Sequence, residues 1–394
     1  MAPTETLDYR VSTVDHDIIC APDTITGMAA SLENLGVSRA LVVCGPTILK
    51  HSNVVQRVQE ALGDRCIGLF SGVVPHSPVE MLEEAAAIAR ELQPDVLVAV
   101  GGGSTSDTCK GIAVLLAEGG EVADYEIRFE PPNKIFVPDT PHKKIFIIAV
   151  ATTLGAAELS RGGGGFTSKA LGRKILISGK GTTPRIIIID GQALATTPLS
   201  IQLSTGIGQF RIAVESLYSK DHQPIGDALA LHTIKMMMEH LPQCVDQNID
   251  SLLQAKSASC MIMLARPGLG LNTAMAHNIG GLYDVPHGEA NSIILPYTMR
   301  FNLDASADRQ VLIAQAMGID TLNMTYEEAG LAAADGVSQL CQKLGLPMRL
   351  RDVGVPEEGL ELIAAATLHD RGLATNPKQI TDAGPIMSVL RDAW

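Results

Sequence analysis

A run of three glycines and a serine, Gly101-Gly102-Gly103-Ser104, is the part of the sequence that points most directly to a ligand. It follows the apolar run Val96 to Val100 and precedes a helical pattern that begins at Thr108. A strand, a glycine turn and a helix in this order direct free backbone N–H groups and a helix dipole at a phosphate, and a Cβ would hold that phosphate away. The turn predicts a dinucleotide site with Ser104 as an added donor and Asp107 as a further contact. The alternative is a turn that serves only strand–helix packing, with Asp107 as a first-turn acid and Lys110 on a solvated face.

A second polar turn, Thr152-Thr153-Leu154, follows the apolar run Ile145 to Val150. In a doubly wound sheet, the turns at the carboxyl ends of the strands surround the ligand crevice. We therefore expect Thr152, Thr153 and Leu154 to face the same cofactor. The alternative is a plain loop in which the threonine hydroxyls bond their own backbone.

The elements that carry these turns are predicted from hydrophobic patterns. Short apolar runs, too continuous for a half-exposed strand, alternate with helical patterns in the first half of the chain, which is typical of a parallel sheet buried on both faces. After about Asp190 the strand-like runs give way to long helical patterns. The sequence predicts a doubly wound α/β domain over residues 1–190 and an all-α domain over residues 191–394. The expected strands are Ala40 to Cys44, Ile67 to Phe70, Val96 to Val100, Ile145 to Val150 and Ile186 to Ile189, and the expected helices include Val54 to Leu62, Pro78 to Leu92, Pro224 to Leu241, Ile249 to Leu264 and Tyr326 to Leu344.

The proline-rich segment Asp124 to His142 is expected to form an exposed loop over the first domain.

Composition sets the limits on function. The chain has 394 residues, more than one hydrophobic core usually holds, and its net charge of −13 would repel a nucleic acid. Seven scattered cysteines without a C-x-x-C motif are typical of free thiols in a reducing compartment. Neither a secretory signal nor a membrane-length apolar run is present. We expect a cytoplasmic protein that binds a small molecule, with no nucleic-acid or membrane partner.

Together with the segment Ala274 to Asn291, the two turns resemble the iron-type alcohol dehydrogenase superfamily, which includes maleylacetate reductases and, more distantly, dehydroquinate synthase. The similarity extends from end to end, and the turn Thr152 to Glu158 resembles the shorter Thr-Thr turn of maleylacetate reductases. The resemblance implies a dehydroquinate synthase-like architecture and places this chain nearest the maleylacetate reductase branch. Further similar stretches are Gly72 to Glu80, Ser216 to Ser219, Leu295 to Asn302, Asn376-Pro377 and Asp392 to Trp394.

The metal site of that superfamily is the point of departure. Metal-dependent members hold the ion with an Asp and a His four residues apart and with two further His, and the resemblance places these positions at Gly208, Ile212, Thr273 and His287. Only one of the four is a good ligand, whereas Zn²⁺ or Fe²⁺ normally needs three or more protein ligands. We expect no metal. Maleylacetate reductases keep His at two of these positions, so the resemblance does not settle the substrate.

Without a cation, another acid must protonate the substrate oxygen, and an imidazole suits this work near pH 7. The resemblance places His277 and His287 on the wall of the catalytic cleft and makes them the candidate acids. Asp284 and, with less support, Tyr283 are candidates to orient or replace them. The alternative for either His is a hydrogen-bonded core residue.

The candidate substrate-binding residues are Gln209, Arg211, Ile212 and Thr273. Ile212 and Thr273 stand at the lost ligand positions, and Gln209 and Arg211 replace polar residues of the superfamily. Arg211 is a candidate clamp for a carboxylate. The alternative for Gln209 and Arg211 is an ordinary helix surface.

The cofactor is expected to be NAD(H) or NADP(H). In NAD-specific relatives an Asp after the early strand repels a 2′-phosphate, whereas here Gly45 leaves room for that phosphate and Thr47 could bond to it. This favours tolerance of NADPH.

Three functions follow as hypotheses. The first is a metal-independent, NAD(P)(H)-dependent oxidoreductase for a small carbonyl, enone or alcohol. The second is a non-redox dehydratase, isomerase or cyclase on the same scaffold, and the third is a binding protein without catalysis. Relatives often form dimers through an N-terminal strand, for which Leu7 to Val14 is the candidate, so a homodimer is expected; an edge strand within one subunit is the alternative.

Overall fold

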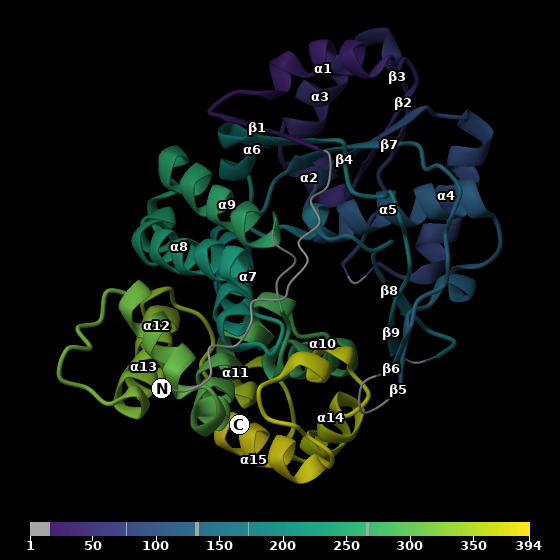
Figure 1. The fold of residues 1–394 in the computed structure, drawn as a ribbon. Coiled ribbons are helices and arrows are strands. Elements are labelled where there is room, and N and C mark those ends of the chain that lie inside the picture. Colours follow the sequence, from purple (N-terminus) through teal and green to yellow (C-terminus); the bar gives the residue numbers. More distant parts are fainter. Residues whose placement is uncertain (1–15, 76, 131–133, 172, 265–267) are drawn as a thin grey trace.

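A six-stranded parallel sheet forms the first part of the protein, which is described by a computed structural model for residues 16–75, 77–130, 134–171, 173–264 and 268–394 (Figure 1). The strand order is β1-β10-β7-β4-β2-β3. Five strands lie at the predicted runs, whereas the exposed edge strand β1 was not predicted. The strand expected from Leu7 to Val14 lies outside the described residues. The strands are β1 Asp17–Ala21, β2 Ala40–Cys44, β3 Cys66–Phe70, β4 Val96–Gly101, β7 Phe146–Ala151 and β10 Ile186–Asp190.

Helices cover both faces of this sheet. Leu41 and Val43 of β2 enter the core shared with α4 (Val79–Leu92) and α5 (Gly103–Glu118), and Val42 enters the core shared with α1 (Met28–Leu35) and α3 (Val54–Leu62). Alternate side chains of one strand therefore reach two different cores. This burial on both sides explains why the strands read as continuous apolar runs and confirms the predicted doubly wound arrangement.

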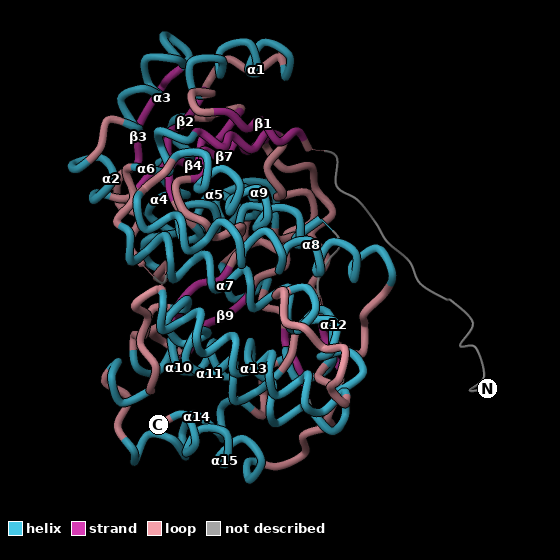
Figure 2. Tube along the Cα trace, turned by 90° about the vertical axis from the view of Figure 1, so that its left-hand side faces the viewer, coloured by secondary structure: helices cyan, strands magenta, loops and turns pink. Residues whose placement is uncertain are grey.

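Helices make up the regular structure that the protein has after β10, apart from short 3-10 turns, among the residues described. In Figures 1 and 2 the helices α10, α11, α14 and α15 gather at the end of the molecule opposite α1 and α3. The helices are α6 Gly191–Ala195, α7 Leu199–Tyr218, α8 Pro224–His240, α9 Ile249–Leu264, α10 Leu271–Tyr283, α11 His287–Asn302, α12 Ala307–Ala316, α13 Tyr326–Lys343, α14 Leu360–Thr367 and α15 Ala383–Ala393.

Two small hairpins leave the sheet and reach toward α10 (Figure 1). One consists of β5 (Arg128–Glu130) and β6 (Lys134–Phe136), and the other of β8 (Gly165–Ser168) and β9 (Arg173–Leu176). The expectation of a plain loop over Asp124 to His142 was therefore wrong. Both short strands contain aromatic and branched side chains that favour extended pairing, and the described prolines of this segment lie outside the strands.

Three further predictions concern the whole chain. Within the described ranges, no helix combines the length and apolar character that a membrane crossing requires. All seven cysteines are described and unpaired, and five of them are buried. The domain boundary near residue 190 stays a prediction, although β10 ends at Asp190.

The crossing of α7 and α11 brings the two long helices unusually close. A Cβ added to Gly288, the second residue of α11, would overlap the backbone carbonyl of Ser204 on α7. Because the obstructing atoms belong to the backbone, they cannot move aside as a side chain could. Only glycine at position 288 therefore allows the first turn of α11, which begins at His287, to lie this close to the backbone of α7.

We predict that Gly288→Ala lowers the free energy of unfolding by about 2 kcal/mol, since a methyl group there forces the two helices apart. The matched control is Gly281→Ala in α10, where an added Cβ meets nothing within 4 Å. That control should be neutral or stabilising by up to about 1 kcal/mol, because alanine is the better helix former. Urea unfolding of both variants gives the comparison, and equal stability would contradict the close crossing.

Candidate active site

Three turns meet at the carboxyl edge of the sheet, as predicted. Cys44 at the end of β2 lies opposite Val100 of β4, and Gly101 at the end of β4 lies opposite Ala151 of β7. The turns that follow these strands are therefore neighbours. The strand order reverses at this point, because β3 lies to one side of β2 and β4 to the other, and open α/β sheets bind ligands at such a point.

The glycines of the turn Gly101 to Gly103 are required by close packing against neighbouring residues. A Cβ on Gly101 would lie 2.5 Å from the Thr105 hydroxyl oxygen, and one on Gly102 would lie 2.9 Å from the Thr153 methyl carbon. Gly103, at the start of α5, is similarly close to the loop after β7. The glycines thus bring the first turn of α5, which includes the half-buried Ser104, against that loop.

Gly45 and Thr47 lie beside this turn, at the start of α2 (Pro46–His51). A Cβ on Gly45 would lie 2.9 Å from the carbonyl oxygen of Val73. Packing against the backbone of residue 73 is therefore one reason for glycine at this position, and the expectation that Gly45 leaves room for a phosphate stays a prediction. Thr47 is exposed on the first turn of α2.

A buried lysine of α5 holds the loop after β7. The Lys110 ammonium donates to the carbonyl oxygens of Ala157 and Ser160, at 2.6 and 2.8 Å, and to the Ser160 hydroxyl at 2.7 Å. Lys110 is fully buried, so its expected position on a solvated face was wrong. Burial lowers the pKa of this ammonium to about 8, against the opposing effect of the Asp107 and Glu158 carboxylates.

A second buried lysine, Lys256 of α9, holds the same loop from the other side. Its ammonium donates to the Glu158 carboxylate at 2.5 Å and to the Gly155 carbonyl. The backbone of Leu154 donates to the Gln202 side chain at 3.0 Å. The buried Thr152 uses its backbone N–H to bond the carbonyl of Gly101 at 3.1 Å, which ties the loop directly to the glycine turn.

Asp107 connects α5 to β8. Its carboxylate accepts a hydrogen bond from the Gly165 backbone N–H at 3.1 Å. Burial raises its pKa, while Lys110 and Lys174 act in the opposite direction. The structure therefore gives Asp107 a definite partner within the protein, at the position where the sequence predicted a cofactor contact.

A buried polar network joins α7 to α10. The Arg211 guanidinium donates to the Glu215 carboxylate at 3.1 Å and to the Thr273 hydroxyl, and that hydroxyl donates to the same carboxylate at 2.5 Å. The Thr273 backbone N–H donates to the other Glu215 oxygen at 3.2 Å. Both of these Arg211 hydrogen bonds are made by Nη1, and Nε is buried without a hydrogen-bond partner among the described residues. The role of Arg211 as a carboxylate clamp stays a prediction.

The same face of α7 carries Gly208, Gln209 and Ile212. A Cβ at Gly208 would meet nothing within 4 Å, so open space lies beside this buried position. Ile212 is buried, and the side-chain oxygen of Gln209 is buried without a partner in the described part of the chain. The helix therefore borders a space that its own side chains do not fill.

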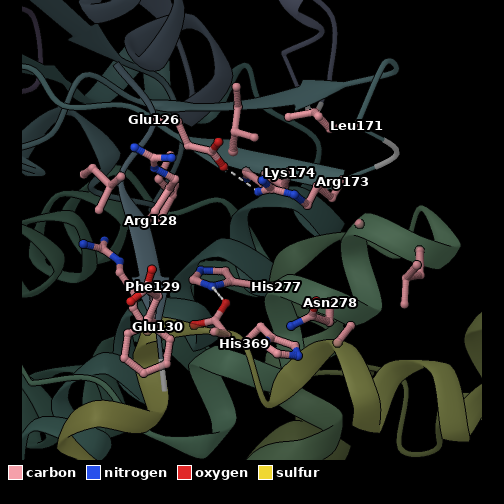
Figure 3. A pocket seen from close by; sticks show the side chains of 18 residues that line it. Glu126, Arg128, Phe129, Glu130, Leu171, Arg173, Lys174, His277, Asn278 and His369 are labelled. Atoms are coloured by element: carbon pink, nitrogen blue, oxygen red, sulfur yellow. Dashed lines mark hydrogen bonds and ion pairs between the residues drawn. The ribbon is translucent and has the colours of Figure 1, made fainter. Parts of the chain in front are cut away.

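The two candidate histidines come together. His277 of α10 and His287 at the start of α11 stack with their ring centroids 5.5 Å apart and an interplanar angle of 18°. His277 Nδ1 lies 2.8 Å from a carboxylate oxygen of Asp370 (Figure 3). The second oxygen of Asp370 accepts the Gly372 backbone N–H at 2.7 Å. An ionised carboxylate only accepts, so Nδ1 carries the proton and Nε2 is left for chemistry.

Asp284 and Tyr283 lie in the short connection between these two helices. Asp284 ends α10 with φ at +56° and is exposed, and Tyr283 is the last residue of the helix. Whether Asp284 orients or replaces either imidazole stays a prediction.

A cavity of about 630 Å³ opens beside His277, between the two hairpins and the helices α10 and α14 (Figure 3). Its size is typical of a small-molecule site. Apolar side chains form part of its wall. The charged residues on its wall are Glu126, Arg128, Glu130, Arg173, Lys174, Asp370 and Arg371.

Sequence reasoning missed several side chains of this region. Glu215 follows Arg211 by four residues on one helix, so helical spacing could have revealed that pair. Asp370 lies 93 residues from His277 and carries no local signal of its role. The two buried lysines were missed because lysines in helices usually face solvent.

Comparison with known proteins covers most of the chain. Residues 15–191 match the model for iron-containing alcohol dehydrogenase, and residues 202–394 match the C-terminal model of the Fe-containing alcohol dehydrogenase family. The 1,3-propanediol dehydrogenase of Klebsiella pneumoniae is 30% identical over 98% of both chains. Maleylacetate reductase of Pseudomonas knackmussii is 27% identical over 98% of this chain and 97% of its own.

The fold agrees with these matches. The crystal structure of a 1,3-propanediol oxidoreductase is similar with a TM-score of 0.88 and 28% sequence identity. The similarity covers 98% of this chain and 100% of the other. The arrangement of sheet and helices therefore agrees with that of the family over most of the chain.

We predict that Lys110→Met lowers the free energy of unfolding by about 3 kcal/mol, since it leaves three oxygens of the loop without their donor. Below pH 8, Lys110 is charged in both states. Between pH 8 and its unfolded value of 10.5 the unfolded chain binds more protons, so the stability of the native protein relative to the variant should increase with pH.

Denaturant unfolding at pH 7 and pH 9.5 measures this prediction. Lys143→Met, which replaces an exposed lysine, is the control and should change stability by less than about 0.5 kcal/mol. A Lys110 variant as stable as the control would show that the loop does not depend on this ammonium.

Proposed function

The chain belongs to the iron-containing alcohol dehydrogenase family, and from this premise we propose that it is a metal-independent, NAD(P)(H)-dependent oxidoreductase for a small carbonyl, enone or alcohol. The observation that carries the proposal is the stacked pair His277–His287 beside ligand positions that cannot bind a metal ion. A carboxylate fixes one of the two rings, and open space lies beside Gly208 on α7. The site has a proton donor in a defined orientation where the family has a cation.

The dinucleotide fits the turn after β4. The backbone N–H groups of Gly101 to Gly103 and the hydroxyl of Ser104 would hold its phosphates at the start of α5, where the first N–H groups have no partner within the helix. Thr152, Thr153 and Leu154 would face it from the adjacent loop, with Thr47 at its far end. A bound nicotinamide supplies or accepts the hydride. No acidic residue occupies Gly45 to Thr47, which supports use of both NAD(H) and NADP(H).

A divalent cation does not fit the donor set of this chain. The residues Gly208 and Ile212 have no side-chain lone pair for a metal ion, and the Thr273 hydroxyl is already bonded to a guanidinium and a carboxylate. Among the described residues, no three His, Cys, Asp or Glu side chains gather in a way that could hold an ion.

The histidines take over proton transfer in this proposal. His277 Nδ1 donates to Asp370, which fixes the ring and leaves Nε2 to hold or release a proton at the substrate oxygen. His287 stacks on that ring. Ile212 and Thr273 shape that space, and Gln209 offers a buried amide oxygen without a partner among the described residues. Asp370 is thus a positioning residue for His277.

A homodimer remains part of the proposal. β1 forms the edge of the sheet, and Ile18 and Ile19 on it are 36% and 38% exposed. An exposed edge strand with apolar side chains is suited to pairing with another chain.

We predict that purified protein reduces members of a panel of aldehydes, ketones and enones with NADH or NADPH while a strong chelator is present. His287→Ala should lower kcat/KM by about 100-fold or more, since general acid catalysis typically contributes about 10²–10⁴-fold. His232→Ala, which replaces an exposed histidine on α8, should leave the rate unchanged. Absorbance of the reduced nicotinamide gives the rate.

Other outcomes identify other functions. Loss of turnover with chelator and recovery with a divalent metal ion would overturn metal independence. Product formed without net cofactor change, and without transfer of isotope-labelled hydride, would favour a non-redox dehydratase, isomerase or cyclase. Tight dinucleotide binding without any turnover would indicate a binding protein.

A further inference from the structure

In the cavity beside His277, the carboxylates are bonded to other described residues of the protein, whereas two of the cations are not. These carboxylates all have a partner within the protein: Glu126 pairs with Arg173 at 2.6 Å, Glu130 pairs with Lys134 at 3.4 Å, and Asp370 accepts a hydrogen bond from His277. The negative charges of Glu126 and Glu130 are therefore paired with cations before any ligand arrives. The Glu126–Arg173 pair is visible at the upper edge of the cavity in Figure 3.

Two cations on the same wall make no hydrogen bond or close ion pair within the described part of the chain. Arg128 of β5 has none with any residue in the described ranges, and Lys174 of β9 has none either, although its charge acts from a longer distance on the buried Asp107 carboxylate. A guanidinium and an ammonium whose donors face one cavity without hydrogen-bonded partners favour an anionic ligand. This local excess contrasts with the net charge of −13 for the whole chain, which would not by itself attract anions.

The cavity also lies between the two parts of the proposed site. Lys174 packs on Gly165, whose N–H donates to Asp107 in the early turns of α5. At the opposite side, His277 is itself part of the wall. A ligand in the cavity would therefore extend from the side of the proposed dinucleotide turn to the His277 imidazole.

Apolar side chains separate the charged groups. Ile127, Phe129 and Leu282 contribute carbon surface to the wall, so the cavity suits a short carbon chain that ends in a charged group. A fully hydrated polyanion would find too few donors for its charge.

We propose that this cavity binds the anionic end of the substrate, a carboxylate or a similar oxyanion, through Arg128 and Lys174. The inference rests on the proposed oxidoreductase function and gives it a substrate class: a short aldehyde, ketone or alcohol with a terminal acid group. The reacting carbon then lies toward His277, and the acid group lies at the hairpins.

The test compares 4-hydroxybutanoate with its uncharged isostere 4-hydroxybutanamide by isothermal titration calorimetry, without dinucleotide. The native protein should bind the acid about tenfold more tightly, the magnitude of one charge-assisted hydrogen bond. In the double variant Arg128→Gln/Lys174→Gln this preference should fall below about twofold. Lys143→Gln, with an exposed lysine outside the cavity, should keep the full preference.

Equal affinity of the native protein for acid and amide, no measurable binding of the acid, or a preference that survives in the double variant would each overturn the assignment. If the double variant instead loses affinity for NADH or NADPH and keeps the preference, the two cations serve a dinucleotide phosphate and the assignment is wrong. Binding of the acid at the cavity without any nicotinamide-dependent turnover would reject the proposed function while the anion site stands. Turnover of uncharged substrates without the acid preference would reject the anion site alone.

Discussion

The position of the candidate site depends on two buried ammonium groups, which donate hydrogen bonds to the loop after β7. An unpaired charge in the interior is very unfavourable, so Lys110 and Lys256 require the oxygens that the loop after β7 supplies. One ammonium comes from α5, which begins at the glycine turn, and the other comes from α9 of the helical part. The loop is therefore fixed relative to both, and its Thr153 can pack on Gly102 without a gap. The geometry of the proposed dinucleotide cleft follows from this arrangement.

A second fixed charge organises the opposite wall of the cleft. The guanidinium of Arg211, the carboxylate of Glu215 and the hydroxyl of Thr273 form a closed network between α7 and α10. One turn further along α10, His277 emerges next to the start of α11. In our account this network has the place that metal ligation has elsewhere in the family: it holds the helices together, and the imidazoles carry the proton.

Much of the fold was predictable, and the reason is burial on both faces of the sheet. Strands such as β2 and β4 are apolar along their whole length because alternate residues enter different cores, and their order places the turns at Gly101 and Thr152 side by side. β1 contains the apolar residues Ile18 to Ala21, but it lies exposed at the sheet edge, so burial between two cores does not explain it. The hairpin strands are only three or four residues long, and neither they nor β1 were predicted.

The candidate site was predictable only where its residues are close in sequence or match a known motif. His277 and His287 were found in this way, and the structure brings their rings together. Asp370 was not, because a tertiary contact between α10 and a distant turn leaves no local periodicity. The burial of Lys110 could not be predicted for a related reason. Two of its partners are backbone carbonyls of a loop, and a backbone carbonyl is present whatever the residue type.

The central claim is that imidazole has replaced a cation at this site. The most direct measurement is anomalous diffraction from crystals of the protein grown with NADPH and excess Zn²⁺, recorded at the zinc absorption edge. The account predicts electron density for the dinucleotide at the turn after β4 and no anomalous peak within bonding distance of His287. A strong peak ligated by His287 together with two or more other side chains of the chain would contradict it.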